Sequence, residues 1–349
     1  MHIEQFDPVA DASRLRACFE MFEGAKPEDD PNGPPMSLPG FTGWWGIGWN
    51  SDPREAWLAT DDGGESAGGY LLELPELDNT TTAWLQLVVA MSRRRSGVGY
   101  ALLRHSAARA ARAGRTLMFA DSAAESPGAE FARACGARQG LIDVRRVLDV
   151  AAMPAGHLRR LRESAEPRAA GYSLVSWQGP VPEVYLGQVA AINTAMADAP
   201  LSPGEEPVYW DADRVATSDR RIIAQGIRQY SIAARCDASG ELAALTQLGV
   251  DPESPEWGHQ GLTAVTRPHR GNRLGLLVKV AVLEQLASCE PQLTRIITDN
   301  TDTNQHMIAI NAELGYQIMD YWVTWELEVA DAAQAGGTGP DRRAAADQS

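Results

Sequence analysis

Two segments of this 349-residue chain resemble each other at an offset of 176 residues. The first segment covers residues 88–99 and the second covers residues 264–275. Each follows an apolar run with strand character and precedes a long helix with apolar periodicity. Further downstream, residues 134–137 and 313–316 align at an offset of 179 residues. A repeat of this length indicates a duplicated domain rather than a solenoid of small units.

The two halves have similar predicted secondary structure. In the first half, strands are expected at residues 2–6, 56–60, 68–74, 82–90, 116–120 and 144–150. Its helices are expected at residues 9–22, 97–113 and 129–135, and the Pro/Gly-rich residues 24–48 should be irregular. In the second half, strands are expected at residues 172–177, 231–236, 242–250, 259–265, 295–298 and 321–329. Its helices are expected at residues 182–196, 212–227, 274–289 and 305–314.

This order of elements predicts an α/β fold with two tandem domains, each a mixed, mostly antiparallel sheet flanked by helices. The middle strands of each half are joined by loops too short for a crossover, so they should be antiparallel. Later strands are separated by helices, which permits a parallel pair. The predicted limits are residues 1–150 and 171–330 for the domains, 151–170 for a linker that includes a possible helix at 153–166, and 331–349 for a disordered tail.

The charge balance excludes several classes of protein. The chain has 31 Lys and Arg against 46 Asp and Glu, a net charge of −15. This is a poor match for binding nucleic acid phosphates or an anionic membrane. No segment reaches the ~20 consecutive apolar residues of a membrane span, and residues 1–14 lack the pattern of a secretory signal. The sequence therefore predicts a cytoplasmic protein.

The four cysteines are far apart in the sequence and form no C-x-x-C pair. This spacing predicts reduced, mostly buried thiols and no metal site.

The segment Arg94-x-x-Gly97-x-Gly99 is the sequence feature that points to binding of an anionic ligand. Its glycines lie where a strand turns into a helix, and glycine allows positive φ and a close approach of the backbone to a ligand. The first N–H groups of a helix lack intrahelical acceptors and favour anions such as pyrophosphate. Arg93, Arg94 and Arg95 add positive charge. The order differs from a G-x-G-x-x-G dinucleotide site, and the chain has no Gly-Lys-Ser/Thr of a P-loop.

This motif resembles the acyl-CoA pyrophosphate loop of the GNAT superfamily of N-acetyltransferases, Arg/Gln-x-x-Gly-x-Gly/Ala. The second copy, Arg270-Gly271-x-Arg273-x-Gly275, matches at its first and last positions and departs at Arg273, which can add a phosphate contact or block one. Residues 304–316 resemble the later helix of the family, which ends in Gly and an aromatic residue. The resemblance covers nearly the whole chain as a tandem of two domains, similar to the mycothiol synthase-like two-domain acyltransferases of actinobacteria.

The resemblance implies direct transfer of an acyl group, by default acetyl, from acyl-CoA to an amine in a ternary complex. In this family the fourth and fifth strands of a domain separate and hold the pantetheine arm. Backbone N–H groups of the fourth strand bind the thioester oxygen, here near 87–89 (Val89) and 264–266 (Val265). Asn300 and Asn304 resemble residues that bind pantetheine, although Asn304 is equally well explained as a helix N-cap.

The candidate proton-transfer residues of this chain depart further from the family pattern than the phosphate loops do. In many relatives a tyrosine four residues before the Gly-aromatic pair protonates the thiolate, but Ala132 and Asn311 occupy these positions. Tyr316 is the remaining candidate acid, with a core role as the alternative. Glu256 and His259 open the fourth strand of the second half, where relatives place a base; a surface histidine is the alternative. The second domain therefore has the better proton-transfer candidates, and the first has the more regular phosphate loop.

Loops that could meet the acceptor have alternative explanations. Trp44, Trp45 and Trp49 either line an acceptor pocket or pack a long loop onto the sheet. Glu205 and Glu206, in the acidic run 198–206, either bind a cationic amine or form a solvated loop.

The sequence leaves three hypotheses for function. The first is an acetyl-CoA-dependent N-acyltransferase acting on a small-molecule amine, as in secondary metabolism or detoxification, and active as a monomer or homodimer. The second is a non-catalytic acyl-CoA-binding sensor or scaffold, because both tyrosine positions lack an acid. The third, protein N-acetylation, needs an open peptide groove, which the long loops at 24–48 and 196–210 disfavour.

Overall fold

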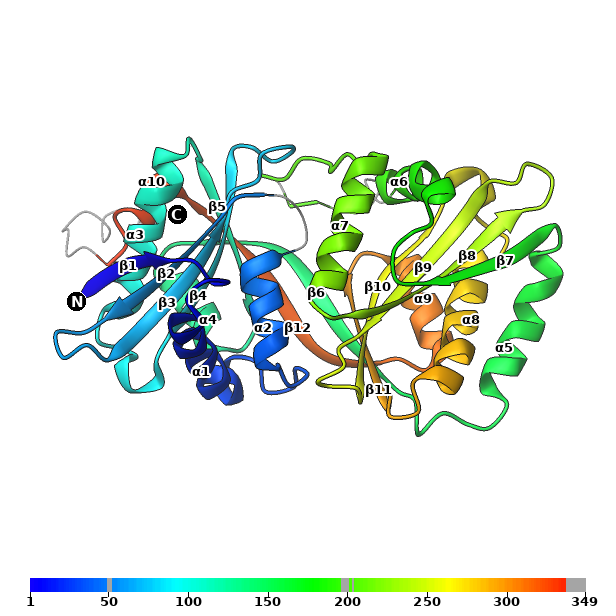
Figure 1. Ribbon diagram of the computed structural model, residues 1–349, viewed down its shortest axis with the longest axis horizontal. Helices are drawn as coiled ribbons and strands as arrows, with labels where there is room; N and C mark the ends of the chain where they lie inside the picture. The colour runs from blue at the N-terminus through cyan, green and yellow to red at the C-terminus, as the bar shows by residue number, and fades with distance from the viewer. Residues whose placement is uncertain (49–51, 196–200, 203, 337–349) are drawn as a thin grey trace, which may run out of the picture.

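The twelve strands formed by the described residues belong to one continuous sheet. The computed structural model describes residues 1–48, 52–195, 201–202 and 204–336. The strand order is β1-β2-β3-β4-β5-β12-β6-β11-β10-β9-β8-β7 (Figure 1). The pairs β4–β5 and β10–β11 are parallel and the other neighbours are antiparallel. This confirms the mixed, mostly antiparallel α/β fold.

The elements of the first half follow the predicted order. The strands are β1 (His2–Phe6), β2 (Arg54–Thr60), β3 (Ser66–Glu73), β4 (Thr82–Val89), β5 (Leu117–Ala123) and β6 (Arg138–Asp149). The helices are α1 (Ala12–Asp29), α2 (Leu38–Thr42), α3 (Val98–Arg112) and α4 (Pro127–Ala134).

The second half repeats this order. The strands are β7 (Tyr172–Gln178), β8 (Arg228–Cys236), β9 (Leu242–Val250), β10 (Trp257–Val265), β11 (Arg295–Thr301) and β12 (Gln317–Glu328). The helices are α5 (His157–Ala165), α6 (Leu186–Thr194), α7 (Ala212–Ala224), α8 (Leu274–Cys289), α9 (Gln305–Leu314) and α10 (Val329–Ala332).

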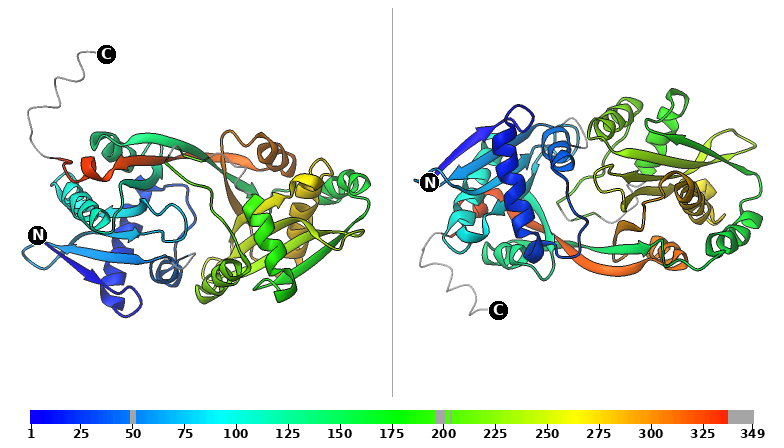
Figure 2. Two further views of the ribbon diagram at one scale, coloured as in Figure 1. Left: turned by 90° about the horizontal axis from the view of Figure 1, so that it is seen from above. Right: turned by 60° about the horizontal axis from the view of Figure 1, so that its bottom comes forward.

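The last strands of the two halves are interleaved. Strand β12, from the second half, pairs with β5 from Trp322↔Ala123 to Glu328↔Leu117 and also pairs with β6. Strand β6, from the first half, pairs in turn with β11. Both long strands run between the two halves (Figure 2). The sheet is therefore not divided at residues 150 and 171. A division of the chain into two domains at these residues remains a proposal.

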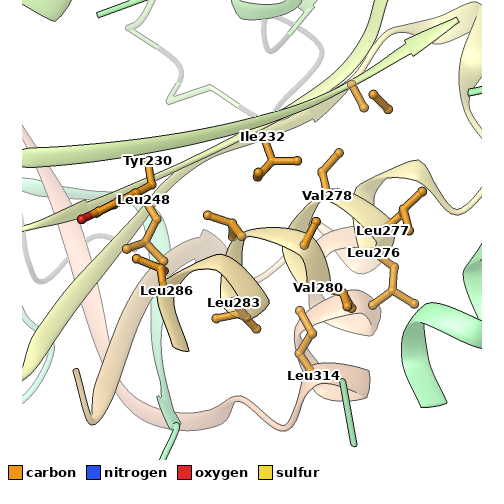
Figure 3. Close-up of a cluster of buried hydrophobic side chains, with 14 of the residues drawn as sticks. Tyr230, Ile232, Leu248, Leu276, Leu277, Val278, Val280, Leu283, Leu286 and Leu314 are labelled. Carbon is orange, nitrogen blue, oxygen red and sulfur yellow. The ribbon is translucent and has the colours of Figure 1, made fainter. Parts of the chain in front are cut away.

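Helices cover both faces of the sheet in each half. In the first half, α1 and α2 pack on one face and α3 on the other. In the second half, α6 and α7 cover one face, and α5, α8 and α9 cover the other. Figure 3 shows Tyr230 and Leu248 of the sheet beside Leu286 of α8, and Ile232 beside Val278 of the same helix. Burial of these apolar side chains is the main stabilisation of each layer.

Two expectations about irregular segments were wrong, those for residues 24–48 and for the start of the tail. Residues 24–48 contain the end of α1, α2 and a π-helical turn at Gly43–Ile47. The helix expected within the linker, at residues 153–166, is present as α5, which packs against α8 through Ala165 and its neighbours. The predicted tail begins as α10, which packs against α3 and buries Ala332 and Ala335. Residues 337–349 lie outside the described residues.

Candidate functional site

The parallel strands β10 and β11 separate soon after they meet. They pair from Trp257↔Arg295 to His259↔Ile297 and then diverge. On its other side, β10 carries a bulge between Gln260 and Thr263. A cavity of ≈ 240 Å³ lies at this separation. It is lined by His259, Gln260, Gly261, Leu262, Thr263, Lys279, Thr298, Asp299, Asn300, Asn304 and Met307. A β-bulge is a common device for redirecting backbone groups beside a site.

A chain of polar side chains lies behind this cavity. Lys279 of α8 is 1% exposed, and its Nζ donates to Asn311 Oδ1 at 2.7 Å. The amide nitrogen of Asn311 donates to Asn300 Oδ1 at 2.6 Å. The ring of Tyr316 lies 5.0 Å from Lys279 Nζ. Burial lowers the pKa of Lys279 to about 7.

Gln260 brings an unused acceptor to the same cavity. Its side chain is 2% exposed, and its Nε2 donates to Gln247 O at 2.7 Å and to Thr246 Oγ1 at 3.0 Å. Among the residues that the structure describes, Gln260 Oε1 has no hydrogen-bond partner. A buried acceptor without a partner is costly, so an N–H group of a ligand is favoured here.

The two arginine loops share one backbone path. In the first loop Arg95 and Gly97 have positive φ of 62° and 89°. In the second loop Gly271 and Arg273, at the corresponding positions, have positive φ of 85° and 55°. Although arginine replaces glycine at position 273, the second loop therefore keeps the left-handed turn that leads into the N-terminus of the helix.

The side chains of these loops make ion pairs and backbone contacts. Arg94 Nη1 lies 3.1 Å from Glu28 Oε2, and Arg94 also pairs with the neighbouring Asp29 at the end of α1. Arg273 pairs with Glu313 of α9. Arg270 Nε donates to the carbonyl of Val265 at 3.1 Å. Arg95 is exposed.

Gly99 and Gly275 allow close packing of the helix that follows each loop. A Cβ atom at Gly99 would lie 3.3 Å from the ring of Phe131. A Cβ atom at Gly275 would lie 3.1 Å from Ile310 Cδ1. The last glycine of each motif therefore lets α3 and α8 approach the next helix, α4 or α9.

The three predicted catalytic residues lie in different surroundings. His259 lines the cavity, and its Nε2 lies 3.3 Å from Asp299 Oδ2. Glu256 does not line it; its backbone carbonyl accepts the N–H groups of residues 294 and 295 at 3.0 Å. Tyr316 is 4% exposed in the core under Lys279, and its hydroxyl has no partner among the described residues. Burial raises the pKa of Tyr316.

The backbone expected to bind the thioester lies slightly beyond the cavity. The cavity is lined by residues 260–263, rather than 264–266. The side chain of Val89 packs into the core of the first half beside Gly99. The side chain of Val265 packs into the core of the second half beside Gly275. Asn304 lines the cavity and also caps α9, with its Oδ1 accepting from Met307 N at 3.2 Å.

The corresponding place in the first half is apolar. Strands β4 and β5 also pair over three residues, from Thr82↔Leu117 to Trp84↔Phe119. The rings of Trp84 and Phe119 then stack at 5.0 Å. The repeat offsets place Leu103 where Lys279 lies and Ala132 where Asn311 lies. The polar chain is thus specific to the second half.

A second cavity of ≈ 270 Å³ lies on the opposite side of β10. It is lined by Val189, Asn193, Trp210, Val215, Ser218, Asp219, Ile222, Gln247 and Leu262. Leu262 therefore lines both cavities. Asn193 Oδ1 has no hydrogen-bond partner in the described part of the chain. Asp219 accepts the N–H of Val181 at 2.6 Å, and burial raises its pKa.

Carboxylates gather where the two halves meet. The register of β5, β12, β6 and β11 places Asp121, Asp143 and Asp299 on one face of the sheet. Burial together with the charges of Asp299, Glu205 and Asp302 raises the pKa of Asp143 to about 6. The mutual repulsion of these groups favours a cationic ligand over an anionic one.

The tryptophans and acidic residues that were expected to contact the acceptor lie elsewhere in the described structure or outside it. Trp44 and Trp45 pack with Phe22 and Phe41 in the core of the first half. Trp49 lies outside the described residues, as do residues 198–200 and 203 of the acidic run. Glu205 accepts the N–H of Ser202 at 2.9 Å, and the N–H of Glu206 donates to Asn79 Oδ1 at 2.7 Å.

Sequence reasoning missed Lys279, Asn311 as its partner, and Gln260. The available signal was a single lysine inside the apolar run of α8, in a chain with two lysines. An isolated lysine on a buried helix needs a partner or a function, because burial of an unpaired charge is expensive.

Comparisons with known proteins agree with this architecture. The sequence profile of the acetyltransferase (GNAT) family matches residues 15–137. A tandem GNAT protein from the clavulanic acid biosynthesis pathway is 27% identical with a TM-score of 0.74, and the match covers 94% of this chain and 98% of that one. A GCN5-related N-acetyltransferase from Sphaerobacter thermophilus is 14% identical with a TM-score of 0.63, covering 94% and 95%. A putative acetyltransferase from Pyrococcus horikoshii is 15% identical with a TM-score of 0.56, covering 94% and 89%. No curated protein sequence matches significantly.

Two kinds of feature are absent from the residues that the structure describes. No helix in this part of the chain is long and apolar enough to cross a membrane. No group of three or more His, Cys, Asp or Glu side chains in the same ranges is placed to hold a metal ion.

Proposed function

We propose that this chain, a tandem GNAT protein whose residues 15–137 match the acetyltransferase family, transfers the acetyl group of acetyl-CoA to the amine of a small molecule. Acyl transfer in general follows from the family and the fold. The donor, the acceptor and the domain that performs the reaction are our proposal.

The observation that carries the proposal is the cavity between β10 and β11. It lies close to the turn at Arg270–Gly275, through which β10 leads into α8. In the proposed complex, the pyrophosphate binds at the N-terminus of α8 with Arg270, and the pantetheine arm enters between the separated strands. Gln260 Oε1 and Asn304 are available to its amide groups.

The reaction needs an amine without its proton and a leaving group that accepts one. His259 is the proposed base, because it lines the cavity and its ring is held by Asp299. The neutral amine attacks the thioester carbonyl, and backbone N–H groups at the bulge of β10 stabilise the oxyanion. The C–S bond then breaks and CoA leaves as the thiol.

The acceptor is proposed to bind in the second cavity and to reach the thioester past Leu262. A volume of ≈ 270 Å³ fits a small molecule rather than a peptide segment. Trp210 offers an apolar surface, and Asn193 Oδ1 offers an unused acceptor. The carboxylate of Asp299, which lines the cavity between β10 and β11, favours a positively charged amine as it approaches the thioester.

Several expectations remain part of this proposal. We propose a cytoplasmic enzyme, a monomer or homodimer, that does not act on nucleic acids or membranes. Secondary metabolism is the proposed setting, because a similar tandem protein comes from the clavulanic acid biosynthesis pathway.

Calorimetric titration of acetyl-CoA into the wild type, Arg94→Ala and Arg270→Ala tests which loop holds the donor. We expect Arg270→Ala to weaken binding at the working site and to abolish CoA release with an amine panel. Loss of turnover in Arg94→Ala alone would move the reaction to the first half. Binding without turnover for any amine would support the alternative function, a non-catalytic acyl-CoA sensor, which the apolar Trp84–Phe119 stack favours for the first half.

A further inference from the structure

Lys279 is buried among apolar side chains, and no carboxylate of the described residues forms an ion pair with its ammonium group. It lies in the middle of α8, where nine other helix residues belong to the core. In the described part of the chain, its ammonium group donates to one acceptor, Asn311 Oδ1. An ammonium group has three protons to donate, so this environment leaves it undersatisfied.

The contacts of Lys279 fix its ammonium group beside the cavity. Asn311 uses its N–H₂ group for Asn300 Oδ1, which turns its oxygen towards Lys279. The ring of Tyr316 stabilises the ammonium through its π face. The side chain of Lys279 also lines the cavity between β10 and β11, and therefore borders the space that a bound group would occupy.

We propose that Lys279 is the general acid of the acyl transfer and protonates the sulfur of CoA as it leaves. The inference rests on the proposed function of the second half. The N–C bond to the acceptor amine forms, and the C–S bond breaks with its electron pair on sulfur. One proton of Lys279 Nζ forms the S–H bond, which leaves a neutral lysine. The proton that the amine has lost to His259 passes to solvent, and Lys279 regains a proton from solvent before the next cycle.

The surroundings make this transfer favourable. Burial disfavours the charged form of a lysine, so loss of the proton lowers its free energy in this environment. The pKa of Lys279, about 7, lies below the ~8.5 of an ordinary thiol. Other titratable groups that face the site are His259 on β10, Asp299 on β11 and Tyr316 before β12. Burial alone lowers the pKa of Lys279, so no carboxylate holds its proton.

This role also accounts for a substitution in the family pattern. Asn311 occupies the position where relatives carry a tyrosine acid, and a carboxamide cannot donate a proton to a thiolate. Its oxygen instead orients Lys279. In the first half, Leu103 and Ala132 fill the two corresponding positions.

The first test is Lys279→Met in the full-length chain. We expect kcat for CoA release to fall by at least ~100-fold, the usual contribution of a general acid. Acetyl-CoA affinity by calorimetry should stay within about threefold, and the thermal unfolding midpoint should be unchanged or higher, because an apolar side chain replaces an undersatisfied cation. Lys26→Met, which removes the other lysine, is the matched control and should keep wild-type kcat.

The second test follows Lys279 directly. Because the chain has two lysines, protein labelled with ¹³C at the lysine ε carbon gives two NMR signals, and Lys26→Met assigns them. One signal should titrate near pH 7, and kcat should fall with rising pH over the same range. In Lys279→Met this alkaline decline should disappear.

Several results would overturn the acid role. These are a kcat for Lys279→Met within threefold of wild type, a loss that lies in acetyl-CoA affinity alone, and a Lys279 signal that titrates above pH 9. If Lys279→Met does not fold, Lys279→Gln and the wild-type titration decide by the same criteria. A wild type that transfers acetyl to no amine refutes the proposed function itself, which separates the two failures.

Discussion

Replacing Asp143 with asparagine should stabilise the protein at neutral pH. Asp143 lies on β6 at the face where the halves meet, and its pKa is raised from 3.8 to about 6 by burial and by the charges of Asp299, Glu205 and Asp302. The folded state therefore keeps a proton that the unfolded chain releases. The resulting stability is fully present below about pH 4 and is lost as the pH rises through about 6.

The size of the effect follows from the shift. A shift of about 2 pKa units corresponds to about 3 kcal/mol at 1.36 kcal/mol per unit. Asp143 is partly exposed, so solvent screening reduces this to about 1–2 kcal/mol. Asp143→Asn should therefore raise the free energy of unfolding by this amount at pH 8 and by no more than a few tenths at pH 4.

Urea unfolding of the wild type and Asp143→Asn from pH 4 to pH 8 measures this difference. Asp237→Asn is the matched control, because Asp237 is an exposed aspartate in the turn after β8, far in the sequence from this face. We expect its effect to stay within about 0.5 kcal/mol at every pH. An Asp143→Asn variant that is no more stable than wild type at pH 8, or whose gain does not change with pH, would refute the reasoning.

Two further predictions concern contacts that join distant parts of the chain. Arg145, a buried residue of β6, pairs with both Asp30 and Asp320. Arg145→Met should destabilise the protein by about 3–5 kcal/mol in urea unfolding, because these two half-buried carboxylates lose the guanidinium that they share. Arg159→Met, which removes an exposed pair, should cost less than about 0.5 kcal/mol, and equal effects would contradict the assignment. A chain that ends after Glu328 should unfold at a lower temperature than one that ends after Gly336, because it loses about 2–4 kcal/mol of apolar burial from α10 on α3. Equal midpoints would show that α10 contributes little.

Much of the secondary structure could be predicted from local patterns. The bounds of β1, β9, α8 and α9 agree with the prediction, because turn and cap residues such as Pro8, Pro252 and Gly315 mark their ends. The extension of α1 to Asp29 was not predictable in the same way. Pro27 lies in its last turn, where sequence reasoning ends a helix, although α1 continues past it.

The strand exchange lay beyond the sequence argument for a different reason. The sequence pattern predicts a strand at residues 321–329, but it does not identify the neighbouring strand. The position of β12 between β5 and β6 depends on tertiary packing over the whole chain.

Part of the cavity that forms the candidate site could be located from the sequence, and part could not. The repeat and the arginine motif led to the separation of β10 and β11, and His259, Asn300 and Asn304 all line the cavity there. Lys279 was missed because helix periodicity counts residues by polarity and cannot show that one lysine faces a cavity on a helix buried all round.

The interleaving of β6 and β12 has a consequence for how the protein is made. During synthesis, β5 and β6 leave the ribosome long before the strand that belongs between them, since Leu117 pairs with Glu328 at the far end of the chain. Until β12 is synthesised, the first half therefore exposes unpaired edges of β5 and β6, and unpaired edges can pair with strands of other chains. Closing so long a loop is slow, so we expect the final folding step to follow chain release. A gene fragment that encodes residues 1–150 alone should accordingly give an aggregating product, and co-expression of the remaining segment should rescue it.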